Sequence, residues 1–208
     1  MKPTLIGLTG GIGTGKTVVT KMFEAEGFPV LNADQISREV MQPGKPAFKE
    51  IIQLFGSEVE TPQGLDRRKI RDKIFQNPTL RKQLEKITHP KIMERASELA
   101  SQCAKEGKPI VILEAAVLIE ARLTHLVDCL ILVTATEEQQ RERAAKRDDV
   151  SATEIEAIIK AQLPQDERKK HARYLIDNSG PLQETERQVK EVAKKIRKDF
   201  QPLTRNFC

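Results

Sequence analysis

The sequence predicts an α/β protein in which helices flank a parallel sheet of about five strands. Short apolar runs of strand length recur along the chain, and longer segments with helical periodicity separate them. Strands that alternate with helices join into parallel sheets through right-handed crossovers. The length of 208 residues, with 38% hydrophobic and 31% charged side chains, is typical of one globular domain with its own core.

Five segments have the character of strands: residues 4–9, 28–31, 110–113, 130–133 and 174–176. The third and fourth are continuous apolar runs, which is typical of strands covered on both faces, so we expect them to be central. The first ends in a cluster of glycines, which predicts a turn into a helix with Val19, Met22 and Phe23 on one face and Gly27 at its end.

The interval between the second and third strands, about 46–106, has a helical pattern throughout. Asp66 is a candidate N-cap, and Asn77–Pro78 combines a cap with a first-turn proline. Pro90 is expected to kink or split the long stretch that follows. Because this interval is too long for one crossover, part of it should stand off the sheet as a subdomain.

Later helix starts have clear capping signals. Thr136–Gln139 and Ser151–Glu154 both fit the capping box, and Gly180–Pro181 opens a terminal helix. The sequence therefore predicts a helical hairpin at about 136–173 before the last strand and helix.

The strongest chemical signal is the loop after the first strand. Residues 10–17, Gly-Gly-Ile-Gly-Thr-Gly-Lys-Thr, fit the phosphate-loop pattern of a glycine, four residues, then glycine, lysine and threonine. In such a loop backbone amides surround phosphate oxygens, Lys16 reaches the β- and γ-phosphates, and Thr17 can bind magnesium. A glycine-rich turn without a ligand is the alternative, but no turn requires the lysine and threonine.

Two other nucleotide-binding classes fit less well. A dinucleotide fingerprint would need its third glycine at position 16, which is Lys16. A regulatory GTPase would explain Asp177–Gly180 as a DxxG switch, but this motif follows the last strand and no guanine-specific Asn/Thr-Lys-x-Asp motif occurs.

Phosphoryl transfer also needs a group that accepts the proton of the attacking hydroxyl. Asp34 follows the second strand, at the edge of the sheet where ligands bind in such folds. It could be that base, or it could simply cap the next helix. Arg38, one turn later, could hold Asp34 or an acidic substrate.

Three more side chains have a functional and a structural interpretation. Arg143 and Arg147 lie four residues apart, so both could point at one anion from a mobile lid over ATP, or both could be solvated. His89 precedes Pro90 and could display its ring at a kink or simply pack.

Charge and cysteine content restrict the class of protein. The net charge of +5 comes from the end of the chain, where residues 187–205 carry seven basic and two acidic side chains. One tyrosine, no tryptophan and no nucleic-acid motif argue against a nucleic-acid partner.

Three widely spaced cysteines indicate neither disulfides nor zinc and are expected to be inert. No apolar stretch approaches the roughly 20 residues of a membrane span, and no signal peptide is evident, so we expect a cytoplasmic protein without a membrane partner.

Together these segments resemble the dephospho-coenzyme A kinases, a family of P-loop kinases. The resemblance covers nearly the whole chain. It is strongest in Ile6–Lys16 and continues in Ala33–Asp34 with Arg38, in His89–Pro90, in the lid at 143–151 and in Asp177–Gly180. It implies a P-loop NTPase-type fold and transfer of the ATP γ-phosphate to the ribose 3′-hydroxyl of dephospho-coenzyme A.

The resemblance also implies residue roles. Asp34, Lys16 and Arg143 would be catalytic, with Asp34 as the base. Arg38 and His89 would join Asp34 on the acceptor side, and Thr17 would bind Mg²⁺ delivered with ATP. The implied ATP-binding residues are Gly11, Ile12, Gly13, Thr14, Gly15, Lys16, Thr17, Arg143, Arg147 and Asn178.

Three positions depart from the family pattern. Asn32 replaces the first aspartate of an Asp-Ala-Asp segment, Asp149 replaces a glycine of the lid, and Ala116 replaces a proline in the segment from Glu114 to Glu120. The base, Asp34, remains beside Asn32, and Asp149 is expected to stiffen or reshape its turn. At Ala116 we expect altered local packing and retained activity.

The resulting prediction is a single kinase domain. It comprises a core at about 1–45, 107–135 and 174–208, a helical acceptor-binding region at about 46–106 and a lid at about 136–173. Another small-metabolite or nucleoside monophosphate kinase is the nearest alternative, and a nucleotide-dependent switch or nucleic-acid-binding module is the alternative outside the enzymes.

Overall fold

The structure is a computed structural model that describes residues 2–147 and 151–200. The chain divides into two compact units, residues 1–31 with 100–208 and residues 32–99. The sequence-based division into core, acceptor-binding region and lid follows expected roles and stays a prediction.

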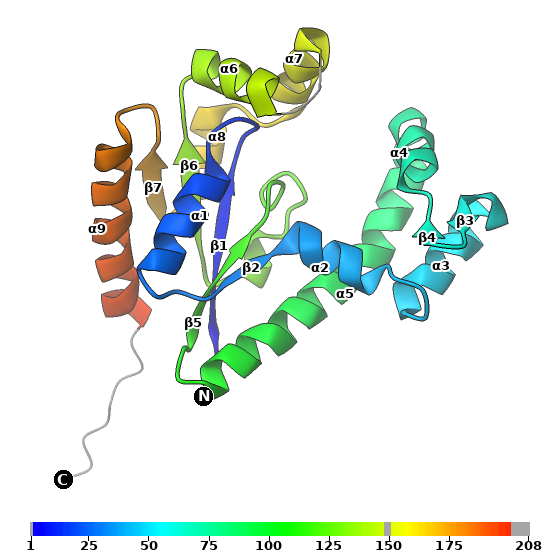
Figure 1. The fold of residues 1–208 in the computed structure, drawn as a ribbon, viewed down its shortest axis with the longest axis horizontal. Helices are drawn as coiled ribbons and strands as arrows, with labels where there is room; N and C mark the ends of the chain where they lie inside the picture. The colour runs from blue at the N-terminus through cyan, green and yellow to red at the C-terminus, as the bar shows by residue number, and fades with distance from the viewer. Residues whose placement is uncertain (1, 148–150, 201–208) are drawn as a thin grey trace. The chain divides into compact units, whose positions relative to one another are not determined.

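A five-stranded sheet with the order β2-β5-β1-β6-β7 forms the centre of the fold (Figure 1). Its strands are β1 (Thr4–Gly10), β2 (Val30–Asn32), β5 (Ile110–Glu114), β6 (Cys129–Thr134) and β7 (Tyr174–Asp177). The pairings β1–β5, β1–β6 and β6–β7 are parallel. The predicted five-stranded α/β fold is therefore confirmed, with the two continuous apolar runs in interior positions.

The core of the first unit explains why these segments fold together. Helix α1 (Lys16–Ala25) and helix α9 (Leu182–Phe200) contribute Val19, Phe23, Val192 and Ile196 to one apolar cluster with the sheet. Phe23 is fully buried and meets Phe28 edge to face at 5.8 Å between ring centroids. This packing holds the start of α1, and with it the glycine loop, against the end of β1.

Three helices continue the first unit between β6 and β7: α6 (Glu137–Arg147), α7 (Ala152–Ala161) and α8 (Gln165–Lys169). Figure 1 shows α6 and α7 at the end of the sheet where β1 and β6 finish. Both predicted capping boxes are present. Thr136 and Gln139 exchange hydrogen bonds before α6, and Ser151 and Glu154 do so before α7.

The second unit contains α2 (Ala33–Val40), α3 (Pro46–Phe55), a 3-10 turn at Ser57–Val59, α4 (Arg67–Gln76) and most of α5 (Pro78–Lys105). Its core includes Ala47, Ile51 and Val59, which are fully buried. Asp66 and Asn77 cap α4 and α5 as predicted, because their side chains accept hydrogen bonds from first-turn amides.

The prediction of helix throughout 46–106 is wrong at one place. Strands β3 (Glu60–Thr61) and β4 (Gly64–Leu65) pair antiparallel between α3 and α4. The turn that joins them contains Pro62 and ends at Gly64, whose φ of 127° is accessible to glycine and strained for other residues. The Thr61 hydroxyl donates to the Gly64 carbonyl at 2.9 Å and closes the turn.

Of the two outcomes predicted for Pro90, a kink or a split, the split is wrong, since α5 continues through it as one helix of 28 residues. Pro90 has no backbone N–H to donate to the Lys86 carbonyl, and nearby side chains bond two other carbonyls of the helix. The Thr88 hydroxyl donates to the Leu84 carbonyl at 2.9 Å, and Lys91 Nζ donates to the Ile87 carbonyl at 3.4 Å. The intact turns on both sides hold the helix together.

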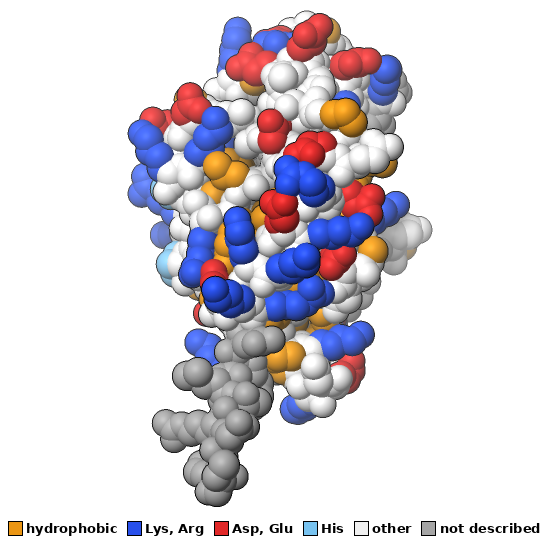
Figure 2. All heavy atoms as spheres, turned by 90° about the vertical axis from the view of Figure 1, so that its left-hand side faces the viewer, with side chains coloured by type: hydrophobic (Ala, Val, Ile, Leu, Met, Phe, Trp, Pro, Cys, Tyr) orange, Lys and Arg blue, Asp and Glu red, His pale blue; other side chains and the backbone are white. Residues whose placement is uncertain are grey.

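Other expectations concern surfaces and thiols. Figure 2 shows the face that carries α9, where Lys and Arg side chains alternate with Asp and Glu. Arg187 pairs with Glu184, Lys190 with Glu186, and Arg197 approaches Glu26.

Cys103 and Cys129 are free, and burial raises the pKa of the Cys129 thiol to about 12, as expected for an inert side chain. Cys208 lies outside the described residues. Within the described ranges, no helix combines the length and apolar character needed to cross a bilayer.

Candidate phosphate-binding site

The glycines of the loop between β1 and α1 have conformational and steric reasons. Gly13 and Gly15 have φ values of 68° and 87°, which glycine adopts without strain. Gly10 is needed for space, since a Cβ there would stand 2.6 Å from the Val133 carbonyl oxygen. Three of the loop glycines are therefore required by conformation or by a close approach.

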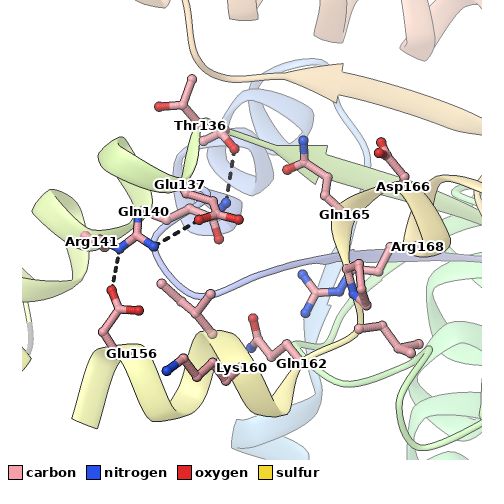
Figure 3. Close-up of a pocket in the computed structure, with 14 residues that line it drawn as sticks. Thr136, Glu137, Gln140, Arg141, Glu156, Lys160, Gln162, Gln165, Asp166 and Arg168 are labelled. Carbon is pink, nitrogen blue, oxygen red and sulfur yellow. Dashed lines mark hydrogen bonds and ion pairs between the residues drawn. The ribbon is translucent and has the colours of Figure 1, made fainter. Parts of the chain in front are cut away.

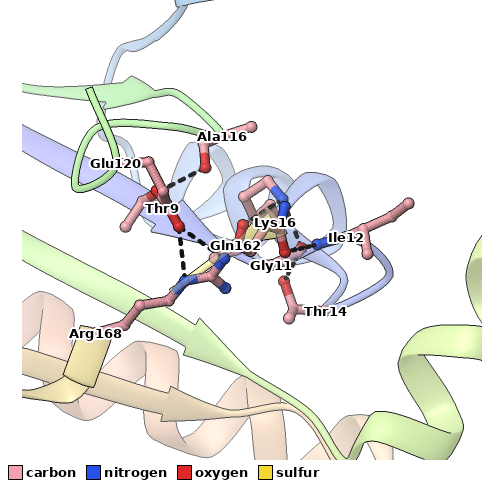
Figure 4. A network of polar contacts seen from close by, with 10 residues as sticks. Thr9, Gly11, Ile12, Thr14, Lys16, Ala116, Glu120, Gln162 and Arg168 are labelled. Atoms are coloured by element: carbon pink, nitrogen blue, oxygen red, sulfur yellow. Dashed lines mark hydrogen bonds and ion pairs between the residues drawn. The ribbon is translucent and has the colours of Figure 1, made fainter. Parts of the chain in front are cut away.

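Lys16, the first residue of α1, folds back over the loop. Its Nζ donates to the carbonyls of Gly10 and Gly11 at 2.8 and 2.9 Å (Figure 4). The Thr14 hydroxyl donates to the Gly11 carbonyl at 3.0 Å. Thr17 follows on the first turn of the helix and is exposed. The lysine charge is thus held at the loop by backbone oxygens.

Asn178, just past β7, supports the loop from the side. It is buried, and its Nδ2 donates to the Thr14 carbonyl at 2.8 Å while its Oδ1 accepts from the Thr185 hydroxyl at 3.0 Å. The Asn178 carbonyl accepts from Arg143 Nη2 at 3.0 Å. Since both ends of its amide are engaged, Asn178 positions the loop and Arg143 together.

Arg143 reaches this region from α6. Its Nη1 is buried without a hydrogen-bond partner among the described residues, and it lies 3.8 Å from the place that a Cβ on Gly15 would occupy. A half-buried guanidinium with one buried, unbonded donor next to a phosphate loop is suited to receive an anion. Arg147 ends α6, but its side chain lies outside the described residues, as does Asp149.

The segment from α6 to α8 contacts the loop at Gly11 and Ile12. A Cβ at Gly11 would stand 2.7 Å from Arg168 Nη1, 2.8 Å from Gln140 Oε1 and 3.1 Å from Gln162 Oε1. The Ile12 amide donates to Gln162 Oε1 at 3.2 Å. Gly11 has no unusual φ, so these side chains, and not backbone geometry, require glycine there.

A cavity of about 570 Å³ opens between α6, α7 and α8 (Figure 3). Its polar lining comes from all three helices, and includes Gln140, Arg141, Lys160, Gln162 and Arg168. Arg141 is fixed by ion pairs to Glu137 and Glu156. The segment from α6 to α8 thus brings polar and cationic groups to the phosphate loop.

Comparison with known proteins agrees with this geometry. A family profile for dephospho-CoA kinase matches residues 4–184. A Bacillus cereus dephospho-CoA kinase is 41% identical over 191 residues, 91% of this chain and 96% of its own. The Geobacter sulfurreducens dephospho-CoA kinase is 38% identical over 189 residues, 90% of this chain and 96% of its own.

The chain belongs to the dephospho-CoA kinase family. The family's activity is ATP-dependent phosphorylation of dephospho-CoA in coenzyme A biosynthesis. Among solved structures, TT1252 from Thermus thermophilus superposes with a TM-score of 0.80 at 30% identity, covering 94% of this chain and 99% of that one. A dephospho-CoA kinase from Campylobacter jejuni shares the fold, with a TM-score of 0.68 at 23% identity and coverage of 94% and 98%. The GTPase interpretation of Asp177–Gly180 is therefore wrong, and Asp177 instead accepts hydrogen bonds from the Ser179 amide and hydroxyl in a local turn.

The departure from the family pattern at Asn32 has a structural role. Asn32 is the N-cap of α2, and its Oδ1 accepts from the Asp34 and Gln35 amides at 2.9 and 3.0 Å. Asp34 therefore does not cap the helix, which removes the structural alternative for this residue. Its side chain is exposed on the first turn of α2.

The second unit contains a cavity of about 450 Å³ near Asp34. Apolar side chains such as Met41, Ile70 and Ile74 line it together with Arg38, Arg67 and Arg71. Burial lowers the pKa of the Arg67 guanidinium, Arg38 lowers it further, and Asp34 acts in the opposite direction. The carboxylate and these two arginines are thus electrostatic neighbours within one unit.

His89 lies in the uninterrupted part of α5 and is half-buried. The two interpretations of His89, a ring displayed at a kink and a side chain that simply packs, both stay predictions. Desolvation lowers the pKa of His89 below its usual 6.5, and Glu85 opposes that shift. The neutral imidazole is favoured at neutral pH.

Sequence reasoning missed Gln140, Gln162 and Arg168 at the loop and Arg67 near Asp34. Their spacing carries no phosphate-binding pattern, since they contact the site through tertiary packing of separate helices. The one available signal was an arginine at 168 in a segment with balanced charge. The loop, Lys16, Arg143 and Asn178 do lie together, whereas Asp34, Arg38 and His89 belong to the other unit. That the two groups meet across one crevice remains a prediction.

Gly11→Ala is expected to lower kcat/KM for ATP by about 10- to 100-fold, because the added methyl group displaces buried side chains that contact the loop. Gly180→Ala is the matched control, since its nearest neighbour would lie 3.9 Å away. Steady-state kinetics with varied ATP provide the measurement. Equal kinetics in the two variants would contradict the assigned reason for glycine at position 11.

His89→Gln is expected to flatten the decrease in stability on acidification. Because the folded pKa lies below the unfolded value of 6.5, the unfolded chain binds the proton first, so stability is full above 6.5 and declines as the pH falls below it. Urea unfolding at pH 7.5 and 5.5 measures the effect. Glu85→Gln should make the decline steeper, and an unchanged slope in His89→Gln would refute the assignment.

Proposed function

We propose that this chain performs the family reaction with the phosphate loop as donor site and Asp34 as the base. The bond between the γ-phosphorus of ATP and its bridging oxygen breaks, and the ribose 3′-oxygen of dephospho-CoA forms a new bond to that phosphorus. Asp34 accepts the hydroxyl proton, and ADP leaves. The joint placement of the loop, Lys16 and Arg143 is the observation that supports this proposal most directly.

On the donor side, the amides and glycines of residues 11–15 would surround the phosphates, as expected for this motif. Lys16 and Arg143 would neutralise charge that develops on the transferred group, and Arg147 would add a second lid cation. Such groups are most effective when they are held in place before reaction. Asn178 would act by holding the loop and Arg143.

On the acceptor side, the cavity of the second unit has the chemistry of the substrate. Dephospho-CoA combines a diphosphate with a long, weakly polar pantetheine arm. Arg38 and Arg67 would bind the diphosphate near Asp34, and the apolar lining would contact the arm. His89, as a neutral side chain, would bind on this side without adding charge.

Magnesium fits the donor set as an ion carried on ATP. Mg²⁺ usually keeps several waters and binds substrate phosphates with one or two protein oxygens, and Thr17 offers an exposed hydroxyl at the loop. In the described ranges no group of three or more acidic, histidine or cysteine side chains could hold a metal by itself. When bound, the ion would neutralise phosphate charge.

A cytoplasmic location and small-molecule substrates alone complete the proposal. The free thiols of Cys103 and Cys129 are compatible with a reducing compartment. The ion pairs along α9 leave a mixed surface instead of a continuous basic stripe, which argues against nucleic acid or a membrane as partner.

ADP release in the presence of ATP and magnesium tests the acceptor. We expect stimulation by dephospho-CoA and not by AMP, other nucleosides or shikimate. Lys16→Ala should lose both nucleotide affinity and turnover, because it removes the charge at the loop. Stimulation by a different acceptor would replace the substrate, and hydrolysis that no acceptor stimulates would favour a nucleotide switch.

Asp34→Asn should lower turnover by about 10²- to 10⁴-fold, which is the usual contribution of a general base, and leave ATP affinity nearly unchanged. Calorimetric titration with ATP and steady-state kinetics measure the two quantities separately. Near-normal turnover would remove Asp34 from the mechanism.

A further inference from the structure

Arg168 is a buried cation that the proposed mechanism does not use. It lies in the short helix α8 and is 6% exposed. Glu120, from the segment after β5, holds one edge of its guanidinium, with Oε1 at 2.9 Å from Nε and 2.8 Å from Nη2 (Figure 4). Nη2 forms no hydrogen bond of its own within the described part of the chain. One carboxylate oxygen therefore faces a group with five donors.

The remaining corner of this guanidinium faces the phosphate loop. Nη1 lies 2.7 Å from the position that a Cβ on Gly11 would occupy, so it contacts the loop at the point where no side chain intervenes. Arginine suits such a position, because its planar fork can bind a carboxylate on one edge and a phosphate on another.

A second observation shows that an oxygen fits at this part of the loop. Gln162 Oε1 accepts from the Ile12 amide at 3.2 Å and lies 3.1 Å from the same Gly11 position. The Ile12 amide and the Arg168 guanidinium thus face one small region at Gly11, and the neutral Gln162 oxygen already binds that amide. These are the features of a phosphate-oxygen site.

A purely structural role explains the pair less well. A buried ion pair contributes little net stability compared with apolar residues of similar size. A tether for α8 alone would not require a guanidinium directed at the loop, nor glycine at position 11 to accommodate it.

The geometry points to Arg168 as a further ATP-binding residue that contacts the terminal phosphate at Gly11–Ile12. Glu120 is its positioning residue. The inference deepens the proposed function, since it adds a fixed cation to the donor site alongside Lys16 and Arg143. We therefore expect Arg168 to favour binding of ATP over ADP, because only the triphosphate brings a phosphate to this point.

Binding and turnover of Arg168→Met test the inference. We expect kcat to fall by about 10²- to 10³-fold, as when one preorganised donor is removed from a transition state. In calorimetric titrations the imido analogue of ATP should bind at least tenfold more weakly, whereas ADP affinity should change by less than about threefold. Lys169→Met, on the exposed face of the same helix, should leave all three quantities near wild type.

Glu120→Gln tests the positioning residue. Arg168 stays charged in this variant but loses its partner, so an intermediate share of the preference for the ATP analogue over ADP should be lost. If Arg168→Met does not fold because Glu120 is left unpaired, the double variant Glu120→Gln/Arg168→Met removes the residual charge and should show the same selective loss.

Equal weakening of the ATP analogue and ADP would overturn the inference, as would a kcat within threefold of wild type in a folded Arg168→Met protein. The binding measurements contain no acceptor. They therefore test Arg168 even if dephospho-CoA fails to stimulate ADP release, and that failure would count against the proposed function alone.

Discussion

The site depends on one constraint, the close approach of neighbouring elements to a bare stretch of backbone between β1 and α1. The Asn178 amide contacts the loop at Gly15, the Gln140 carbonyl contacts it at Gly13, and the Arg168 guanidinium contacts it at Gly11. Each contact occupies space that a side chain would take. Glycine is therefore required for two reasons, tertiary crowding at positions 10, 11, 13 and 15 and, at positions 13 and 15, backbone conformation as well.

The neighbouring elements also bring cations to the loop. Lys16, Arg143 and Arg168 reach the loop from different elements, and oxygens of the protein hold each one: the carbonyls of Gly10 and Gly11, the carbonyl of Asn178, and the carboxylate of Glu120. Cations held in place before the substrate arrives stabilise developing phosphate charge without reorganisation during the reaction. Arg168 is buried and Lys16 and Arg143 are half-buried, so the cost in stability of desolvating a charge is greatest at Arg168.

In the second unit, one residue caps helix α2 and another is the proposed base. Because Asn32 caps α2, the carboxylate of Asp34 is left outside the backbone hydrogen-bond network of the first turn. An asparagine oxygen accepts amide hydrogen bonds as well as a carboxylate does, so the departure from the family pattern preserves the cap.

The features that the sequence predicts correctly depend on interactions between residues close together in the chain. Strand-length apolar runs, capping boxes and the loop motif act over a few positions, so the five strands, the capped helices and the positions of Lys16 and Asp34 were predictable. The β3–β4 hairpin was missed because its strands are two residues each, too short for an alternating pattern. The continuous helix through Pro90 was missed because proline removes one backbone hydrogen bond, whereas the long helical segments on both sides keep theirs.

The amino-acid order by itself determined the fold class, the phosphate loop and the family, because each depends on short-range spacing. Only the tertiary structure decided that Asn178 positions the loop, that Arg168 and Gln162 meet it at Gly11 and Ile12, and that Arg67 accompanies Asp34. These contacts join residues such as Ile12 and Gln162, which are 150 positions apart. No local pattern records such a contact, since it arises from the packing of whole helices and strands.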